Sequence, residues 1–190
     1  MRIGLFFGSF NPIHVGHLII AKHLEYTGAF DQIWLVVSPH NPLKKSSGLL
    51  NKYHRLHLVK LAVEGEKKLK ASQVEFSLPQ PSYTIDTLTH LQEKYPTHKF
   101  SVIMGADSLQ NMDKWKNPEL IRKNYSLYIY GRPGFNPEKN PEEANIHFVD
   151  APLIEISSTQ IRKLIREGKS IRYWVPDAVW EEIEQYNHYH

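Results

Sequence analysis

The chain has 190 residues, enough for one ordinary domain with at most a small appendage. Hydrophobic residues make up 41% and charged residues 23%, which is typical of globular chains and excludes disordered, fibrous and membrane-bundle proteins. The absence of cysteine excludes disulfides and thiolate chemistry, and the net charge of +3 is too small for a protein that coats nucleic acid. We therefore expect a cytoplasmic protein that has no membrane or nucleic-acid partner.

Short β-branched or aromatic runs alternate with helical patterns along the chain. The predicted strands are residues 3–7, 33–37, 74–78, 100–104, 127–130 and 146–149. The predicted helices are residues 15–28, 53–63, 84–95, a segment that starts with Asn117 as its cap and Pro118 as its first residue, 158–167 and 177–186.

This alternation predicts an α/β fold: a Rossmann-like, doubly wound parallel sheet with helices on both faces and a small C-terminal helical segment. We expect residues 1–190 to form a single domain, with the C-terminal helical portion, 158–190, packed on it. Ligands of such sheets bind beyond the carboxyl ends of the strands. The residues that follow Phe7, Val37, Met104 and Tyr130 are therefore candidates for a binding site.

The first candidate site is the stretch Gly-Ser-Phe-Asn-Pro-Ile-His-Val-Gly-His, residues 8–17, directly after the first predicted strand. Gly8 and Ser9 allow a ligand to approach backbone N–H groups, and the helix N-terminus that follows favours phosphate. His14 and His17 share one face of the first helical turn, where imidazoles can bind phosphate oxygens and stabilise the charge of an in-line displacement. The alternatives are a packing role or half of a zinc site, and we expect no metal site because no third ligand lies nearby.

The second candidate site is the stretch Ile-Ser-Ser-Thr-Gln-Ile-Arg, residues 156–162. A simple helix cap needs only one hydroxyl, whereas Ser157, Ser158 and Thr159 provide three. Arg162 lies in the first turn, where a positive charge is unfavourable unless an anion binds there. We interpret this stretch as a clamp for a triphosphate.

Together, the two stretches resemble the HxGH nucleotidylyltransferase superfamily, and within it the nicotinate/nicotinamide mononucleotide adenylyltransferase family. Three further features narrow the resemblance, which spans nearly the whole chain: residues 81–88 (Pro-Ser-Tyr-Thr-Ile-Asp-Thr-Leu), residues 103–109 (Ile-Met-Gly-Ala-Asp-Ser-Leu) and Trp115. The expected single domain is then a nucleotidylyltransferase domain.

The resemblance implies transfer of AMP from ATP to nicotinate mononucleotide, which gives deamido-NAD and pyrophosphate in NAD biosynthesis. The phosphate of the mononucleotide attacks ATP directly, and Mg²⁺ accompanies ATP. The same reaction on nicotinamide mononucleotide, adenylyl transfer to pantetheine phosphate, and a non-catalytic nucleotide-binding sensor of the same fold are alternatives. A homo-oligomer is compatible with the sequence.

The resemblance also assigns residues to roles. The implied ATP-binding residues are Gly8, Ser9, Phe10, His14, His17, Gly105, Asp107, Ser157, Ser158, Thr159, Ile161 and Arg162. The implied mononucleotide-binding residues are Ser9, Phe10, Thr84, Trp115 and Lys116. The implied catalytic residues are His17, His14, Arg162 and the loop lysines Lys44 and Lys45, with His17 as the main stabiliser of the transition state.

Three of these assignments have structural alternatives. In the family, the residue matching Asp107 binds the ribose of adenosine, but Asp107 could equally cap a short helical turn. Trp115 is expected to stack on the pyridine ring, although most Trp residues belong to the core. Thr84 is expected to recognise the nicotinate carboxylate, or only to cap its helix.

Overall fold

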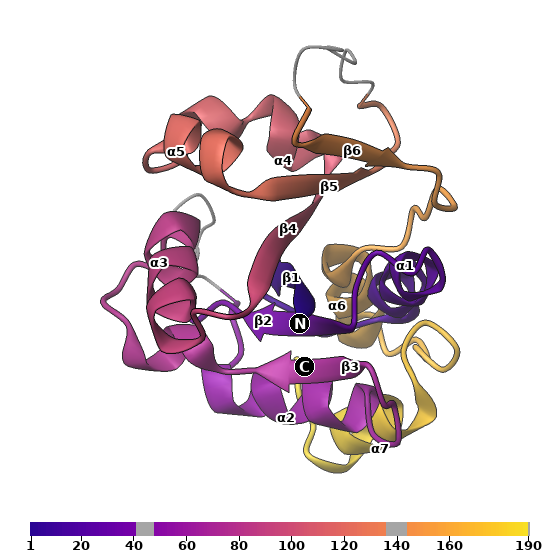
Figure 1. The fold of residues 1–190 in the computed structure, drawn as a ribbon. Coiled ribbons are helices and arrows are strands. Elements are labelled where there is room, and N and C mark those ends of the chain that lie inside the picture. Colours follow the sequence, from indigo (N-terminus) through magenta and orange to yellow (C-terminus); the bar gives the residue numbers. More distant parts are fainter. Residues whose placement is uncertain (41–47, 136–143, 190) are drawn as a thin grey trace.

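The computed structural model describes residues 1–40, 48–135 and 144–189. Within these residues, all neighbouring strands pair in parallel and form one six-stranded sheet in the order β3-β2-β1-β4-β5-β6 (Figure 1). The strands are β1 (Arg2–Gly8), β2 (Gln32–Val37), β3 (Leu69–Ser72), β4 (Lys99–Gly105), β5 (Ser126–Tyr130) and β6 (Ile146–Val149). The strand order reverses between β1 and β4, which confirms the predicted doubly wound fold and places the ligand-binding crevice after these two strands.

Helices cover both faces of this sheet (Figure 1). One face packs against α1 (Val15–Tyr26), α2 (Lys52–Ala62), α6 (Ser158–Arg166) and α7 (Asp177–Gln185). The other face packs against α3 (Thr84–Lys94), α4 (Ala106–Gln110), α5 (Pro118–Asn124) and the short 3₁₀ helix η2 (Met112–Lys114).

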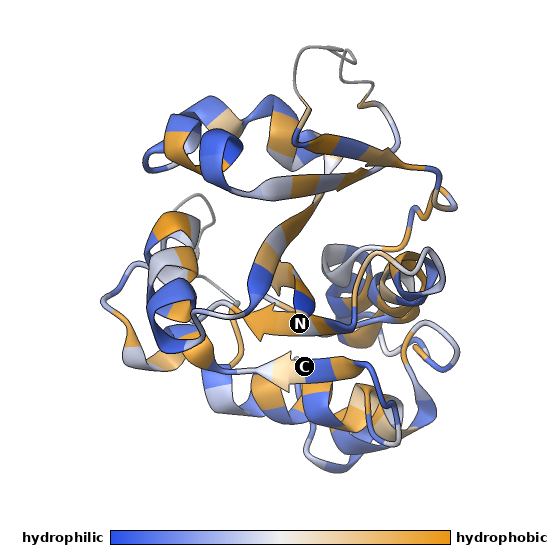
Figure 2. Cartoon of the chain, viewed as in Figure 1, coloured by the Kyte–Doolittle hydropathy of each residue, from blue (hydrophilic) through white to orange (hydrophobic). Residues whose placement is uncertain are grey.

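The two cores follow from the alternation of side chains along each strand. On β1, Leu5 packs into the core beneath α3, and its neighbour Phe6 packs into the core beneath α1. Because both faces of the central strands are covered, they are apolar along most of their length, whereas the helices alternate between apolar and polar residues (Figure 2).

The predicted strand at residues 74–78 is wrong. Residues Val74–Ser77 form the 3₁₀ helix η1, in which the Phe76 amide donates to the Gln73 carbonyl at 2.9 Å. The apolar alternation of Val74, Phe76 and Leu78 does not mark a strand here, because the buried residue of this turn is Glu75, which is 2% exposed. The third strand is instead β3, a four-residue segment at the sheet edge whose single buried residue gives little periodicity.

The predicted start of α5 is half right. Pro118 is the first helical residue, as expected, but the side chain of Asn117 makes no capping hydrogen bond. Asn117 has φ of 51°, a left-handed conformation that Asn tolerates better than most residues. Asn117 therefore starts the helix through its backbone conformation and not through a hydrogen bond from its side chain.

The C-terminal helices belong to the same core as the sheet. Ile161 and Ile165 of α6 and Val179 and Ile183 of α7 are buried together with Phe6 of β1. Among the described residues, no helix has both the length and the apolar composition needed to cross a membrane.

This shared core predicts that the chain unfolds as one unit. We expect Ile183→Ala to lower the free energy of unfolding by about 2–5 kcal/mol, because it leaves a cavity in the core. Denaturant unfolding followed by circular dichroism and by tryptophan fluorescence should show one coincident transition in both proteins. Two separate transitions would show that the C-terminal helices form an independent unit.

Candidate active site

The site lies at the switch point of the sheet, where the chain leaves β1 at Gly8 and β4 at Gly105. Neither glycine has room for a side chain. A Cβ at Gly8 would come 2.8 Å from the ring of Phe10, and a Cβ at Gly105 would meet Oδ1 of Asp107. Both strand ends therefore admit close approach of neighbouring groups to the backbone.

The turn after β1 has a strained backbone. Phe10 has φ of 44°, in the left-handed region that side chains rarely adopt, and its ring is 2% exposed. The ring packs edge-on against Phe6 and His17, with centroid separations of 6.1 and 5.0 Å. Phe10 therefore anchors the turn through its side chain, and only its backbone can face a ligand.

The two predicted imidazoles lie together at the start of α1. The rings of His14 and His17 stack with their centroids 3.7 Å apart and an interplanar angle of 26°. The amide of His14 donates to Nδ1 of His17 at 3.3 Å. Since Nδ1 accepts this bond, the neutral His17 ring carries its proton on Nε2.

Gly16 allows this arrangement. A Cβ at Gly16 would come 2.8 Å from Cγ2 of Ile154 and 3.0 Å from Nδ1 of His14. The segment before α6 therefore packs directly on the backbone of α1, beside the stacked rings.

His14 is neutral at pH 7. It is only 4% exposed, and burial, aided by the positive charge of Arg132, lowers the pKa of His14 from 6.5 to about 4. Its Nδ1 atom is buried and has no hydrogen-bond partner among the described residues. A buried polar atom of this kind is suited to bind a group that the protein itself does not supply.

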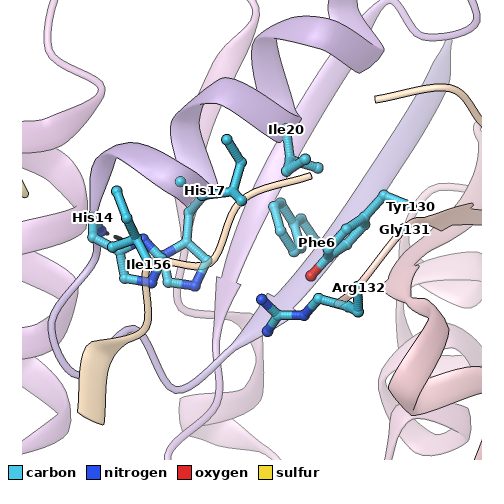
Figure 3. A pocket seen from close by; sticks show the side chains of 10 residues that line it. Phe6, His14, His17, Ile20, Tyr130, Gly131, Arg132 and Ile156 are labelled. Atoms are coloured by element: carbon cyan, nitrogen blue, oxygen red, sulfur yellow. Dashed lines mark hydrogen bonds between the residues drawn. The ribbon is translucent and has the colours of Figure 1, made fainter. Parts of the chain in front are cut away.

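Arg132 shares a small pocket with both imidazoles (Figure 3). The pocket has a volume of about 10 Å³, and its other labelled residues include Phe6, Tyr130 and Ile156. The sequence predicts that residues after Tyr130 lie at the binding site, but it assigns no role to Arg132 itself. Arg132 is the second residue after β5, and this position places a cation opposite the histidines.

Asp107 and Arg132 form an ion pair across the ends of β4 and β5. Oδ1 of Asp107 lies 3.5 Å from Nε of Arg132, and both side chains are partly exposed. Asp107 is the second residue of α4 and Gly105 is its N-cap, so the alternative that Asp107 caps this helix is wrong. Its carboxylate thus stays at the end of β4, beside the guanidinium of Arg132.

The late stretch is hydrogen-bonded to the early one. Oγ of Ser158 donates to the Pro12 carbonyl at 2.8 Å, and Nη1 of Arg162 donates to the Asn11 carbonyl at 2.7 Å. Nη2 of Arg162 also donates to the hydroxyl of Thr159 at 3.4 Å. The two predicted motifs therefore meet in space.

Two residues of the late stretch have structural tasks. Ser157 caps α6, since its hydroxyl accepts the Gln160 amide at 3.2 Å. Ile161 is completely buried in the core, and its amide donates to the Ser157 carbonyl at 3.1 Å. The side chain and the amide of Ile161 are therefore both engaged within the protein, and its contact with ATP stays a prediction.

Of the residues expected to bind the mononucleotide, Thr84, Trp115 and Lys116 are associated with α3. Nζ of Lys116 lies 2.9 Å from both carboxylate oxygens of Asp86 and 5.1 Å from the ring centroid of Tyr83. Thr84 is the first residue of α3, whose N-cap is Tyr83, so Thr84 does not cap this helix. Trp115, next to Lys116, is half-buried against the same core as α3.

Lys44 and Lys45 lie outside the described residues, and the structure does not place them. Among the described residues, no three or more His, Asp or Glu side chains gather in a way that could hold a metal ion.

A parallel sheet of this strand order, with imidazole and guanidinium groups at its switch point, defines a nucleotide-binding α/β protein. A sequence model of the cytidylyltransferase-like family matches residues 5–164. A probable nicotinate-nucleotide adenylyltransferase of Flavobacterium johnsoniae is 54% identical over 100% of this chain and 99% of its own length. A relative with the same description from Bacteroides fragilis is 44% identical over 97% of this chain and 92% of its own.

The solved structures show the same fold. The nicotinic acid mononucleotide adenylyltransferase of Plasmodium falciparum, complexed with NaAD, superposes with a TM-score of 0.85 at 20% identity, over 99% of this chain and 97% of its own. The chain therefore belongs to the cytidylyltransferase-like family, and within it to the nicotinate-nucleotide adenylyltransferases.

The buried imidazole predicts how stability depends on pH. Because the pKa of His14 is about 4 in the folded protein and 6.5 as a free side chain, the unfolded chain binds more protons between these values. Stability should therefore fall as the pH drops from 6.5 towards 4, by up to about 3 kcal/mol from this residue.

The measurement compares the wild type with His14→Gln, which cannot take up this proton. The difference in unfolding free energy between the two proteins should be constant from pH 7 to pH 8. It should change steeply between pH 6.5 and pH 4, and a difference that stays constant over the whole range would show that His14 is accessible to protons.

Proposed function

We propose that this protein transfers the adenylyl group of ATP to nicotinate mononucleotide, giving deamido-NAD and pyrophosphate for NAD biosynthesis. The observation that carries this proposal is the junction of the early and late motifs, which brings Arg162 to the turn that precedes the stacked histidines. The relatives described above are adenylyltransferases of nicotinate nucleotides, and they support the choice of substrate.

The proposed step is a direct displacement at the α-phosphorus of ATP. A phosphate oxygen of the mononucleotide forms a new P–O bond, while the bond between the α-phosphorus and its bridging oxygen to the β-phosphate breaks. The bonding electrons leave with pyrophosphate. The protein needs no nucleophile of its own, because positioning and charge stabilisation are sufficient for such a transfer.

Each group of site residues has its own role in this displacement. His17 donates from Nε2 to the oxygens on which charge develops, and neutral His14 holds the turn and the partner ring in place. Arg132 and Arg162 supply the positive charge for the triphosphate, together with the loop lysines Lys44 and Lys45. ATP is also contacted by backbone and hydroxyl groups of the protein, which come from Gly8, Ser9, Gly105, Ser158 and Thr159. The carboxylate of Asp107 accepts hydrogen bonds from the hydroxyls of the ATP ribose.

The other half of the site binds the mononucleotide. Trp115 offers a face on which a pyridine ring can stack, and Thr84 lies at the N-terminus of α3, where a carboxylate is favoured. Lys116 also lies at this end of α3, where its charge is paired with the carboxylate of Asp86. This environment favours nicotinate over nicotinamide, which has no negative charge.

Mg²⁺ enters this proposal as part of the substrate, bound to the phosphate oxygens of ATP and to water. Its role is to neutralise charge on the pyrophosphate that leaves. We place the reaction in the cytoplasm.

The direct test is release of pyrophosphate from Mg-ATP in the presence of nicotinate mononucleotide, nicotinamide mononucleotide or pantetheine phosphate. We expect the highest kcat/KM with nicotinate mononucleotide. A higher value with the amide would reverse the substrate assignment. Binding of ATP without pyrophosphate release from any of the three would identify a nucleotide sensor.

The role of His17 predicts a large loss of turnover. His17→Ala should lower kcat by about 10²–10³, as expected when one preorganised donor to the transition state is removed. His23→Ala, on the last turn of the same helix, is the matched control and should retain full kcat. Unchanged turnover in His17→Ala would remove this residue from the mechanism.

The role of Trp115 predicts a selective loss of substrate binding. Trp115→Ala should raise the KM for the mononucleotide by about tenfold and the KM for ATP much less, because only the stacking surface is lost. Trp34→Ala removes a half-buried indole from the same core and should change neither KM. Equal increases for both substrates in Trp115→Ala would indicate a packing role.

A further inference from the structure

Arg55 on α2 is the largest completely buried side chain among those described, with 0% exposure. Burial lowers the pKa of its guanidinium, but arginine stays charged in proteins. Among the described residues, Arg55 has no carboxylate partner. A buried charge without a counter-charge is costly unless dense hydrogen bonding compensates for it.

Backbone carbonyls supply that compensation. Nε of Arg55 donates to Leu50 at 2.8 Å, and Nη2 donates to Pro39 at 3.0 Å. Nη1 donates to Ser38 at 2.8 Å and also to the carbonyl of Ser9. One side chain thus binds four carbonyl oxygens.

These carbonyls come from three separate segments. Ser9 belongs to the turn after β1, and Ser38 and Pro39 follow β2 directly. Leu50 lies just before α2, so it is on the other side of residues 41–47. Arg55 therefore fixes both flanks of residues 41–47 to the turn that begins the ATP site.

Asn11 extends this network to the late motif. Its side chain donates to the Gly48 carbonyl at 2.9 Å and accepts the Leu50 amide at 3.1 Å. Its own carbonyl accepts from Arg162. A continuous set of hydrogen bonds consequently joins Arg55, through Leu50 and Asn11, to the proposed triphosphate clamp.

We propose that Arg55 is a positioning residue for adenylyl transfer, whose planar fork aligns the turn at Ser9 with the flanks at Pro39 and Leu50. This inference rests on the proposed function. Arg55 touches no substrate; it acts through the backbone segments that surround the phosphates. The planar guanidinium of Arg55 is essential, because its three nitrogens donate to carbonyls on several sides. The side chain of lysine has a single nitrogen, which cannot reach all of these carbonyls at once.

The test compares Arg55→Lys and Arg55→Gln with Val59→Ala. Val59 is a buried residue one helical turn further along α2, and its side chain can form no hydrogen bond, so its variant reports loss of packing alone. All activities are expressed per folded molecule, with the folded fraction measured by circular dichroism. Binding of the non-hydrolysable ATP analogue with an α,β-methylene bridge is measured by calorimetry.

We expect both Arg55 variants to lose kcat by about 10-fold or more at saturating substrates, because small misplacements at a reacting centre are costly. The Kd of the analogue should rise as well. Val59→Ala should lower the unfolding temperature yet keep the kcat and Kd of the wild type. Either Arg55 variant that folds is sufficient for the comparison.

Wild-type kcat in a folded Arg55→Lys or Arg55→Gln would overturn the proposal. So would a loss of kcat in Val59→Ala equal to that in the Arg55 variants, since the effect would then be general destabilisation. If the wild-type protein releases no pyrophosphate, the proposed function fails separately. Calorimetry of the ATP analogue then tests the role of Arg55 without any turnover. An unchanged Kd of the analogue in the Arg55 variants would refute the positioning role.

Discussion

Two hydrogen bonds join the early and late parts of the proposed site, which are about 150 residues apart in the chain. Ser158 binds the carbonyl of Pro12 and Arg162 binds that of Asn11, across sequence separations of 146 and 151 residues. Without them, the turn after β1 would end in an isolated helix N-terminus, which attracts anions only weakly. With them, α6 adds its hydroxyls and a guanidinium to the same crevice. The parallel sheet makes this contact feasible because all its strands end at one edge.

The sequence predicted those parts of the site that lie in short, contiguous stretches. His14 and His17 are three residues apart at a helix start, and helical geometry alone places them on one face. Asp107 and Trp115 followed from resemblance to a family. The roles proposed for Arg132 and Arg55 could not be predicted from local pattern, because they depend on which strand ends and loops become neighbours, and this is a property of the strand order.

The errors in secondary structure have the same origin. At residues 74–78, apolar residues alternate in the sequence as in a strand, but the segment forms a 3₁₀ turn in which Glu75 is the buried residue. At Asn117, a residue typical of helix caps adopts a left-handed backbone and makes no capping bond. In both cases tertiary contacts outweighed a local preference whose energy is small.

The electrostatics of the site are incomplete without an anion. Arg55 is compensated by carbonyl dipoles, Arg162 by a carbonyl and a hydroxyl, and Arg132 by the partly exposed Asp107. His14 has lost its charge through burial, which avoids a further cation beside Arg132. A polyphosphate in the crevice would add negative charge beside Arg132 and Arg162. Because such a ligand would bind only the folded state, the groups that are costly to bury in the free protein would stabilise the complex.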